Sequence, residues 1–97
     1  MARFDLYRDD ENFLLDVQAD TLVDLNTRVV VPIRLPHAAP MPARRLNPVF
    51  EIEGRGYVMV TQYMAAVPES ELRQLAGNLA EQRDRITAAL DMLFQGF

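Results

Sequence analysis

The segment RVVVPI, residues 28–33, decides the fold class of this 97-residue chain. Its β-branched side chains have few rotamers and fit a pleated surface, so the segment predicts a strand. Pro32 cannot donate a hydrogen bond to a ladder, and we therefore expect that end of the strand at a sheet edge or a bulge. The chain is expected to be built on a β-sheet.

Two β-hairpins are predicted on either side of this strand. Residues 4–7 and 13–18 are apolar runs joined by a charged, turn-prone stretch. Residues 49–52 and 57–61 form the second pair, with Gly54-Arg55-Gly56 as the turn. We expect about five strands in a small barrel-like sheet rather than an open flat one.

The segment 35–45 separates the strand from the second hairpin. It carries prolines at positions 36, 40 and 42, which resist helix, so we expect an extended surface loop. Further on, Pro68, Ser70 and Glu71 predict a short helical turn that Ser70 caps and Gly77 ends.

A terminal helix is predicted after Asn78, which is spaced from Glu81 as in a capping box. Glu81 and Arg85 are expected to pair on its exposed side. The helix has an apolar arc and an opposite arc with Met92 nearby. The apolar arc holds Leu79, Ile86, Leu90 and Leu93, with Phe94 at its border, and the opposite arc holds Asp84, Ala88, Asp91 and Gln95.

The chain end FQGF, residues 94–97, is unusually apolar for a terminus, since termini commonly fray. Two interpretations are open. Phe97 folds back on the core, or the helix end is presented to a partner. The pattern alone favours the first.

Composition excludes several classes of function. The ten basic residues are all Arg and face fourteen acidic ones, giving a net charge of −4, so we expect no direct nucleic-acid binding. The absence of Lys excludes a phosphate-loop lysine and Schiff-base chemistry. The absence of Cys excludes disulfides, zinc thiolates and cysteine nucleophiles.

Candidate catalytic groups are scarce. The one His, His37, and the one Ser, Ser70, lie in no recognisable catalytic context. Glu51 and Glu53 on one side of a strand leave paired-carboxylate catalysis open, although surface Glu is the commoner case. We predict a protein that is not an enzyme, with no catalytic residue, metal or cofactor. It is expected to be one domain over residues 1–97, without a membrane span or signal peptide, and cytoplasmic.

Several stretches resemble, in order and spacing, the CcdB family of plasmid and chromosomal toxins. The similarity covers essentially the whole chain, and the proline-rich loop diverges most. The stretches that carry it are LDVQAD (15–20), RVVVP (28–32), LNPV (46–49), Met59, Thr61, MAAVP (64–68) and ALDMLFQGF (89–97).

The resemblance implies an SH3-like small β-barrel with a C-terminal helix, and a homodimer whose helix ends lie together. It also implies the toxin of a type II toxin–antitoxin module, which binds the DNA gyrase A subunit and traps the enzyme on cleaved DNA. A CcdA-like antitoxin neutralises such toxins with a disordered tail, and the complex represses its own operon. The gyrase-binding positions of the family map here to Thr21, Leu22, Asp91, Phe94, Gln95, Gly96 and Phe97.

Three of these positions depart from the family pattern. Gln95 stands where gyrase-poisoning members carry Trp, and a Trp can stack on a partner's Arg with about 0.5–2 kcal/mol. Asp91 adds a charge where a neutral amide is usual, and Thr21 replaces an aliphatic residue. A second hypothesis is therefore a degenerate relative that keeps the dimer and antitoxin binding but has lost gyrase poisoning.

A third hypothesis is a ribonuclease toxin of the MazF type, because those toxins share this barrel. Fold alone does not transfer function. The net charge of −4 and the scarcity of nucleophiles argue against RNA cleavage.

Overall fold

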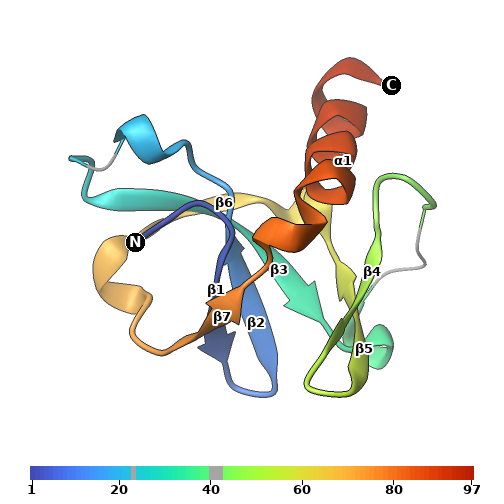
Figure 1. Cartoon of the computed structure of the whole chain (residues 1–97), viewed down its shortest axis with the longest axis horizontal. Coiled ribbons are helices and arrows are strands. Elements are labelled where there is room, and N and C mark those ends of the chain that lie inside the picture. The colour runs from blue at the N-terminus through green and yellow to red at the C-terminus, as the bar shows by residue number, and fades with distance from the viewer. Residues whose placement is uncertain (23, 40–42) are drawn as a thin grey trace.

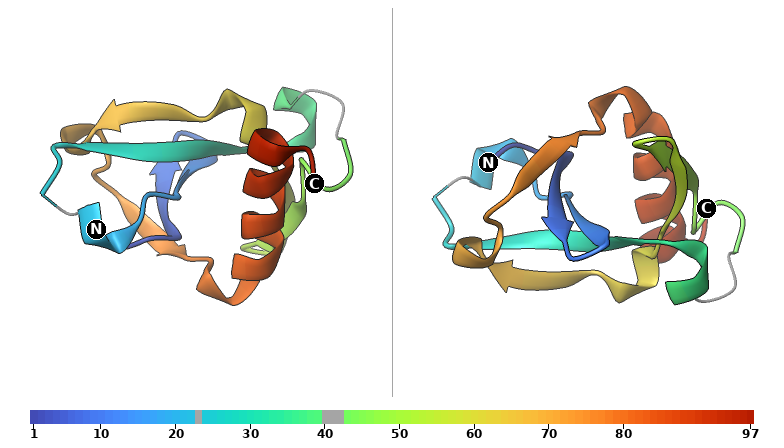
Figure 2. Two further views of the ribbon diagram at one scale, coloured as in Figure 1. Left: turned by 90° about the horizontal axis from the view of Figure 1, so that it is seen from above. Right: turned by 90° about the horizontal axis from the view of Figure 1, so that it is seen from below.

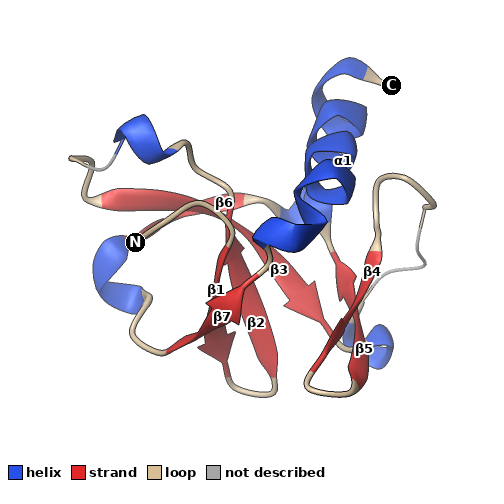
Figure 3. Cartoon of the chain, in the orientation of Figure 1, coloured by secondary structure: helices blue, strands red, loops and turns tan. Residues whose placement is uncertain are grey.

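The computed structural model describes residues 1–22, 24–39 and 43–97. Within them lie seven strands, all paired antiparallel, and one α-helix, α1 (Arg83–Gln95) (Figures 1 and 3). The strands are β1 (Asp5–Asp9), β2 (Asn12–Asp16), β3 (Thr27–Arg34), β4 (Val49–Ile52), β5 (Arg55–Met59), β6 (Ala65–Pro68) and β7 (Leu75–Asn78). The predicted class, mostly β with a C-terminal helix in a small β-barrel fold, is confirmed.

Strand β3 is the centre of the sheet. The strand order is β4-β5-β3-β2-β1-β7, and β6 also pairs with β3. Along one edge, β3 pairs first with β6 over Thr27–Val30 and then with β5 over Ile33–Arg34. Pro32 lies between these two registers, and its carbonyl accepts a hydrogen bond of 2.9 Å from the Val60 N–H. The expectation that this end lies at a sheet edge or a bulge is wrong, because β3 is paired on both sides and Pro32 lies in register opposite Leu14 of β2. Its missing donor falls instead where β3 changes partner from β6 to β5.

Both predicted hairpins are confirmed. In the first, β1 pairs with β2 up to Asp9 opposite Asn12. In the second, the turn is formed by Glu53 and Gly54, whose φ values of 54° and 78° are those of a twist-matched two-residue turn. The turn therefore comes earlier than predicted, and Arg55 already belongs to β5.

Two strands are additional to the predicted five. The segment expected to be a helix ending at Gly77 contains only a 3₁₀ turn, η4 (Glu69–Glu71), and then the extended strand β7. Ser70 lies inside η4 and caps nothing with its side chain. Strand β6 is the other addition. Both strands are short and mostly exposed, so neither shows the alternation that predicts a strand.

The loop after β3 is not extended throughout. Residues Pro36–Ala38 form a 3₁₀ turn, η2, in which proline occupies the first position. Residues 40–42 of this predicted loop lie outside the described part of the chain.

Helix α1 begins later than predicted, at Arg83, after a 3₁₀ turn η5 (Ala80–Gln82). The predicted capping box is wrong: the N-caps of η5 and α1 are Leu79 and Gln82, and the Asn78 side-chain oxygen accepts 2.7 Å from the Ala80 N–H instead. The expected pair of Glu81 with Arg85 is wrong, because Arg85 donates 2.9 Å to the Val49 carbonyl instead. Within the described residues, no helix has the length and apolar character needed to cross a membrane.

The main core lies between the curved sheet and α1, which covers the end of the molecule nearest β4 and β5 (Figure 2). The helix contributes Ile86 and Ala89, both fully buried. Phe13 and Tyr57 meet edge to face beneath it, with ring centroids 5.1 Å apart. Ile86, Ala89 and Leu90 thus hold α1 against the sheet, and the helix continues past them to Gln95.

Candidate functional site

The end of α1 is an exposed apolar tip, which we call the helix tip and define as residues 93–97. Phe94 and Phe97 are each 70% exposed, and Leu93 is 36% exposed. In Figure 1 the last turns of α1 extend beyond the sheet toward the chain end. The interpretation that Phe97 folds back on the core is wrong. Presentation of the helix end to a partner stays a prediction.

Gly96 shapes this tip. Its φ of 80° is left-handed, a conformation that costs other residues energy, and its N–H donates 3.1 Å to the Met92 carbonyl. The helix therefore ends at a defined residue, and the backbone turns to direct Phe97 away from the helix axis.

Asp91 lies one turn before the tip and is half-buried, whereas Gln95 is exposed. Asp91 forms no ion pair with any described residue. A carboxylate in the last turns of a helix opposes the macrodipole at a cost of up to about 1 kcal/mol. The helix thus carries an uncompensated negative charge beside its apolar tip.

Thr21 and Leu22 lie on a separate element, the 3₁₀ turn η1 (Asp20–Leu22). Both are exposed. The Asp20 carboxylate accepts 2.7 Å from the Arg3 N–H, which ties the turn to the start of the chain.

A buried polar network holds η1 in place. The Asp16 carboxylate accepts 2.7 Å from Arg28 Nε and 3.0 Å from the Gln18 N–H. Gln18 in turn donates 3.0 Å from its side-chain nitrogen to the Leu22 carbonyl and accepts 3.1 Å from the Val29 N–H. The chain of contacts therefore runs from strands β2 and β3 to the exposed turn.

The Arg28–Asp16 pair is the anchor of this network. The two side chains are 1% and 0% exposed. The hydrogen bond with Asp16 raises the pKa of Arg28. Arg28 Nη2 has no hydrogen-bond partner among the described residues. Sequence reasoning missed this pair, although a signal existed in Asp16 and Gln18, polar residues within an otherwise apolar run.

The predicted site residues therefore form two patches. Asp91, Phe94, Gln95, Gly96 and Phe97 lie together on the last turns of α1 and just after it. Thr21 and Leu22 lie apart from them, because η1 and α1 are toward opposite ends of the long axis (Figures 1 and 2). Both patches are on the same side of the sheet in Figure 1.

The weaker catalytic candidates are not brought together. His37 and Ser70 lie in different exposed 3₁₀ turns, η2 and η4. Glu53 is in the β4–β5 turn and pairs with Arg8 at 3.0 Å, so it does not share a strand face with Glu51. In the part of the chain that the structure describes, no group of three or more His, Asp and Glu residues is placed to hold a metal ion.

The chain matches the model of the CcdB protein family over residues 3–96. The match includes η1, the buried network and all of α1. Together with the half-barrel sheet and the C-terminal helix, it identifies the protein as a member of the CcdB family, the toxins of toxin–antitoxin systems.

Proposed function

We propose that this chain is a gyrase-directed toxin that acts by binding the A subunit of DNA gyrase rather than by catalysis. It acts in the cytoplasm as a homodimer, and a CcdA-like antitoxin neutralises it. The observation that carries the proposal is the exposed helix tip with Phe94 and Phe97 on it.

The tip has the composition of an anchor for another protein. Large aromatic side chains that become buried at the centre of an interface dominate binding energy. Burying a Phe is worth about 1.5–3 kcal/mol. Because the backbone of Phe94 is already ordered in α1, little backbone entropy is lost when this side chain docks.

The other contacts follow from the same geometry. Gln95 is exposed and offers an amide donor and acceptor beside the two rings. Thr21 and Leu22 supply a second contact held rigid by the Gln18 hydrogen bond. A two-fold dimer would present two such tips, and the two contacts would reinforce each other.

The test is a gyrase cleavage assay with purified toxin, together with direct binding to the A subunit. We expect trapped cleavage complexes, and F94A or F97A should weaken binding by about tenfold or more. Leu75→Ala is the matched control, since Leu75 is also exposed but lies on β7, away from the tip. Absence of gyrase binding by the unaltered protein, or equal losses in L75A, would contradict the proposal.

Gln95 favours a second candidate, a relative that keeps dimer and antitoxin binding but does not poison gyrase. On that account Gln95→Trp should create or sharply increase cleavage complexes, because Trp restores a stacking surface. Binding to the A subunit without cleavage complexes in the unaltered protein would support this candidate. An inert Q95W variant would count against it.

A further inference from the structure

The tight turn of residues 2–5 holds an aromatic residue in an unfavourable backbone conformation. Phe4 has a φ of 72°, in the left-handed region that bulky side chains rarely occupy. The turn is closed twice, because the Asp5 N–H donates 3.1 Å to the Ala2 carbonyl and the Ala2 N–H donates 2.9 Å to the Asp5 carboxylate. We propose that this turn holds η1 in place, and that Arg3 within it is a positioning residue for the contact that η1 makes with a partner.

The strained residue is fixed from three directions. The Phe4 ring is part of the main core, its N–H donates 2.6 Å to the Asp16 carbonyl, and its carbonyl accepts 2.9 Å from the Leu79 N–H. A backbone conformation of this kind persists only where the surrounding structure determines it. The turn is therefore tied both to the end of β2 and to the segment that leads into η5, and it provides a fixed support.

Arg3 connects this support to η1. Both views of Figure 2 show the first residues beside η1. The Arg3 N–H donates 2.7 Å to the carboxylate of Asp20, the first residue of η1, and Arg3 Nε donates 3.2 Å to the Val17 carbonyl. The half-buried Arg3 guanidinium lies 4.8 Å from the centre of the Phe4 ring, which favours a cation over its face. One residue thus joins the strained position to the segment that carries η1.

The turn η1 depends on such contacts for its position. None of its three residues is buried, so packing does not hold it against the core. Arg3 holds its first residue, Asp20, and the Gln18 side chain donates 3.0 Å to the carbonyl of its last residue, Leu22. Thr21 and Leu22 are exposed between and beside these two contacts. A partner that binds them meets an ordered surface, which lowers the entropy lost on binding.

The contacts separate positioning from stability. The bonds of the Phe4 backbone go to Asp16 and Leu79, whereas those of Arg3 and Asp20 join each other and the segment before η1. The main core includes neither Arg3 nor Asp20. Replacing either side chain should therefore loosen η1 and leave the sheet and α1 folded.

The consequence for a partner rests on the proposed function, in which Thr21 and Leu22 contact gyrase. The order of η1 is measured on the free protein, and the contact is measured by binding. Failure of the inference and failure of the proposed function are therefore distinguishable.

Hydrogen exchange of the free protein, measured by mass spectrometry, is the first test. Asp20→Ala removes the acceptor of the Arg3 N–H, so exchange at residues 18–22 should become about fivefold faster, while α1 keeps its protection. Asp20→Asn retains an acceptor oxygen and should stay within about twofold of the unaltered protein. Asp24→Ala is the matched control, because it removes the same charge from an exposed position outside η1. Unchanged exchange in D20A, or faster exchange throughout the sheet and α1, would overturn the proposal.

Arg3→Ala tests the arginine side chain. It removes the hydrogen bond to the Val17 carbonyl and the contact with the Phe4 ring, and it should also speed exchange at residues 18–22. The control is Arg73→Ala, since Arg73 is exposed and its Nε donates to a carbonyl in the separate turn η4. Equal exchange in R3A and R73A would overturn the role of Arg3.

Binding to the gyrase A subunit, measured by surface plasmon resonance, tests the consequence. D20A and R3A should weaken binding by about fivefold. L22A should weaken it as much, because it truncates the contact itself, and the two controls D24A and R73A should not. A loss in L22A without a loss in D20A and R3A would overturn the positioning role. Faster exchange in D20A with full binding by L22A would support the hold on η1 and remove η1 from the proposed gyrase contact.

Discussion

A few individual residues fix the positions of the two predicted contact patches, η1 and the end of α1. Arg28 and Asp16 form a buried ion pair. The Asp16 carboxylate also accepts a hydrogen bond from the Gln18 N–H, and the Gln18 side chain donates to the Leu22 carbonyl at the end of η1. Sequence alone did not predict this pair, because it depends on the register that places β2 beside β3. Gly96, by contrast, was found from the sequence through a family resemblance, and the structure adds its left-handed conformation.

Replacing Arg28 with Met should destabilise the protein by about 3–5 kcal/mol, because Asp16 would remain buried without its charge partner. Urea unfolding followed by circular dichroism measures this loss. Arg55→Met removes an exposed arginine and should change stability by less than about 0.5 kcal/mol. Equal stability of R28M and R55M would show that the buried pair contributes nothing.

Replacing Gly96 with Ala should cost about 1 kcal/mol, because Ala must adopt the left-handed conformation. No atom lies within 4 Å of the added Cβ, so the cost is one of backbone conformation and not of a clash. Gly56→Ala is the control, with φ outside the positive region and a contact of 3.7 Å to Val49. Thermal unfolding of both variants gives the comparison, and an unperturbed G96A would refute the role given to this glycine.

Elements differ in how clearly their sequence predicts them. Both hairpins and α1 follow from local patterns, since each hairpin is two apolar runs around a turn-prone stretch and the helix has an apolar arc at helical spacing. Strands β6 and β7 were missed because each is short and mostly exposed and gains its structure from a distant partner, β3 or β1. The turn η1 is likewise stabilised by a residue outside it, because the Gln18 side chain donates a hydrogen bond to the Leu22 carbonyl.

Gln18→Ala should loosen η1 without unfolding the sheet. It removes the hydrogen bonds to the Leu22 carbonyl and from the Val29 N–H. Hydrogen exchange measured by mass spectrometry should become faster in peptides covering residues 18–22, while peptides from α1 keep their protection. Gln95→Ala, an exposed change on the helix tip, is the control. Unchanged exchange at residues 18–22 would mean that other contacts hold the turn.

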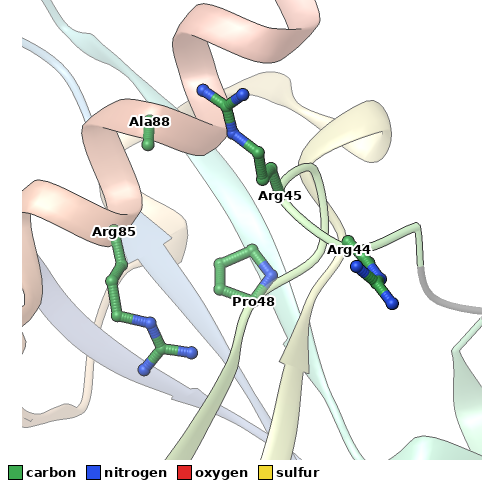
Figure 4. A pocket seen from close by; sticks show the side chains of 5 residues that line it. All are labelled: Arg44, Arg45, Pro48, Arg85 and Ala88. Carbon is green, nitrogen blue, oxygen red and sulfur yellow. The ribbon is translucent and has the colours of Figure 1, made fainter. Parts of the chain in front are cut away.

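At the scale of the molecule, the fold predicted from the sequence is confirmed and the site remains a proposal. A family resemblance named the residues of both patches, and the structure separates them along the long axis (Figure 2). Neither composition nor periodicity could show that separation, because it depends on where the sheet places η1 relative to α1. The hollow lined by Arg44, Arg45, Pro48, Arg85 and Ala88 (Figure 4) could not be predicted either, since its cations come from distant parts of the chain.

The proposed homodimer predicts a melting temperature that depends on concentration. Association stabilises the folded state by mass action, so the thermal midpoint should rise as protein concentration is raised. Sedimentation over the same range should show the mass of two chains. A midpoint that stays constant, with the mass of one chain, would contradict the dimer.

The pairing of β1 with β7 also has a consequence for synthesis. Asp5 lies opposite Asn78, so strand β1 must wait for β7, much later in the chain, to leave the ribosome before the two can pair. Helix α1, which seals the core and bears the exposed aromatic rings, emerges later still. A nascent chain interrupted before residue 75 therefore lacks one edge of its sheet and the whole of that helix. The complete sheet with its covering helix can therefore form only after residues 75–95 have been synthesised.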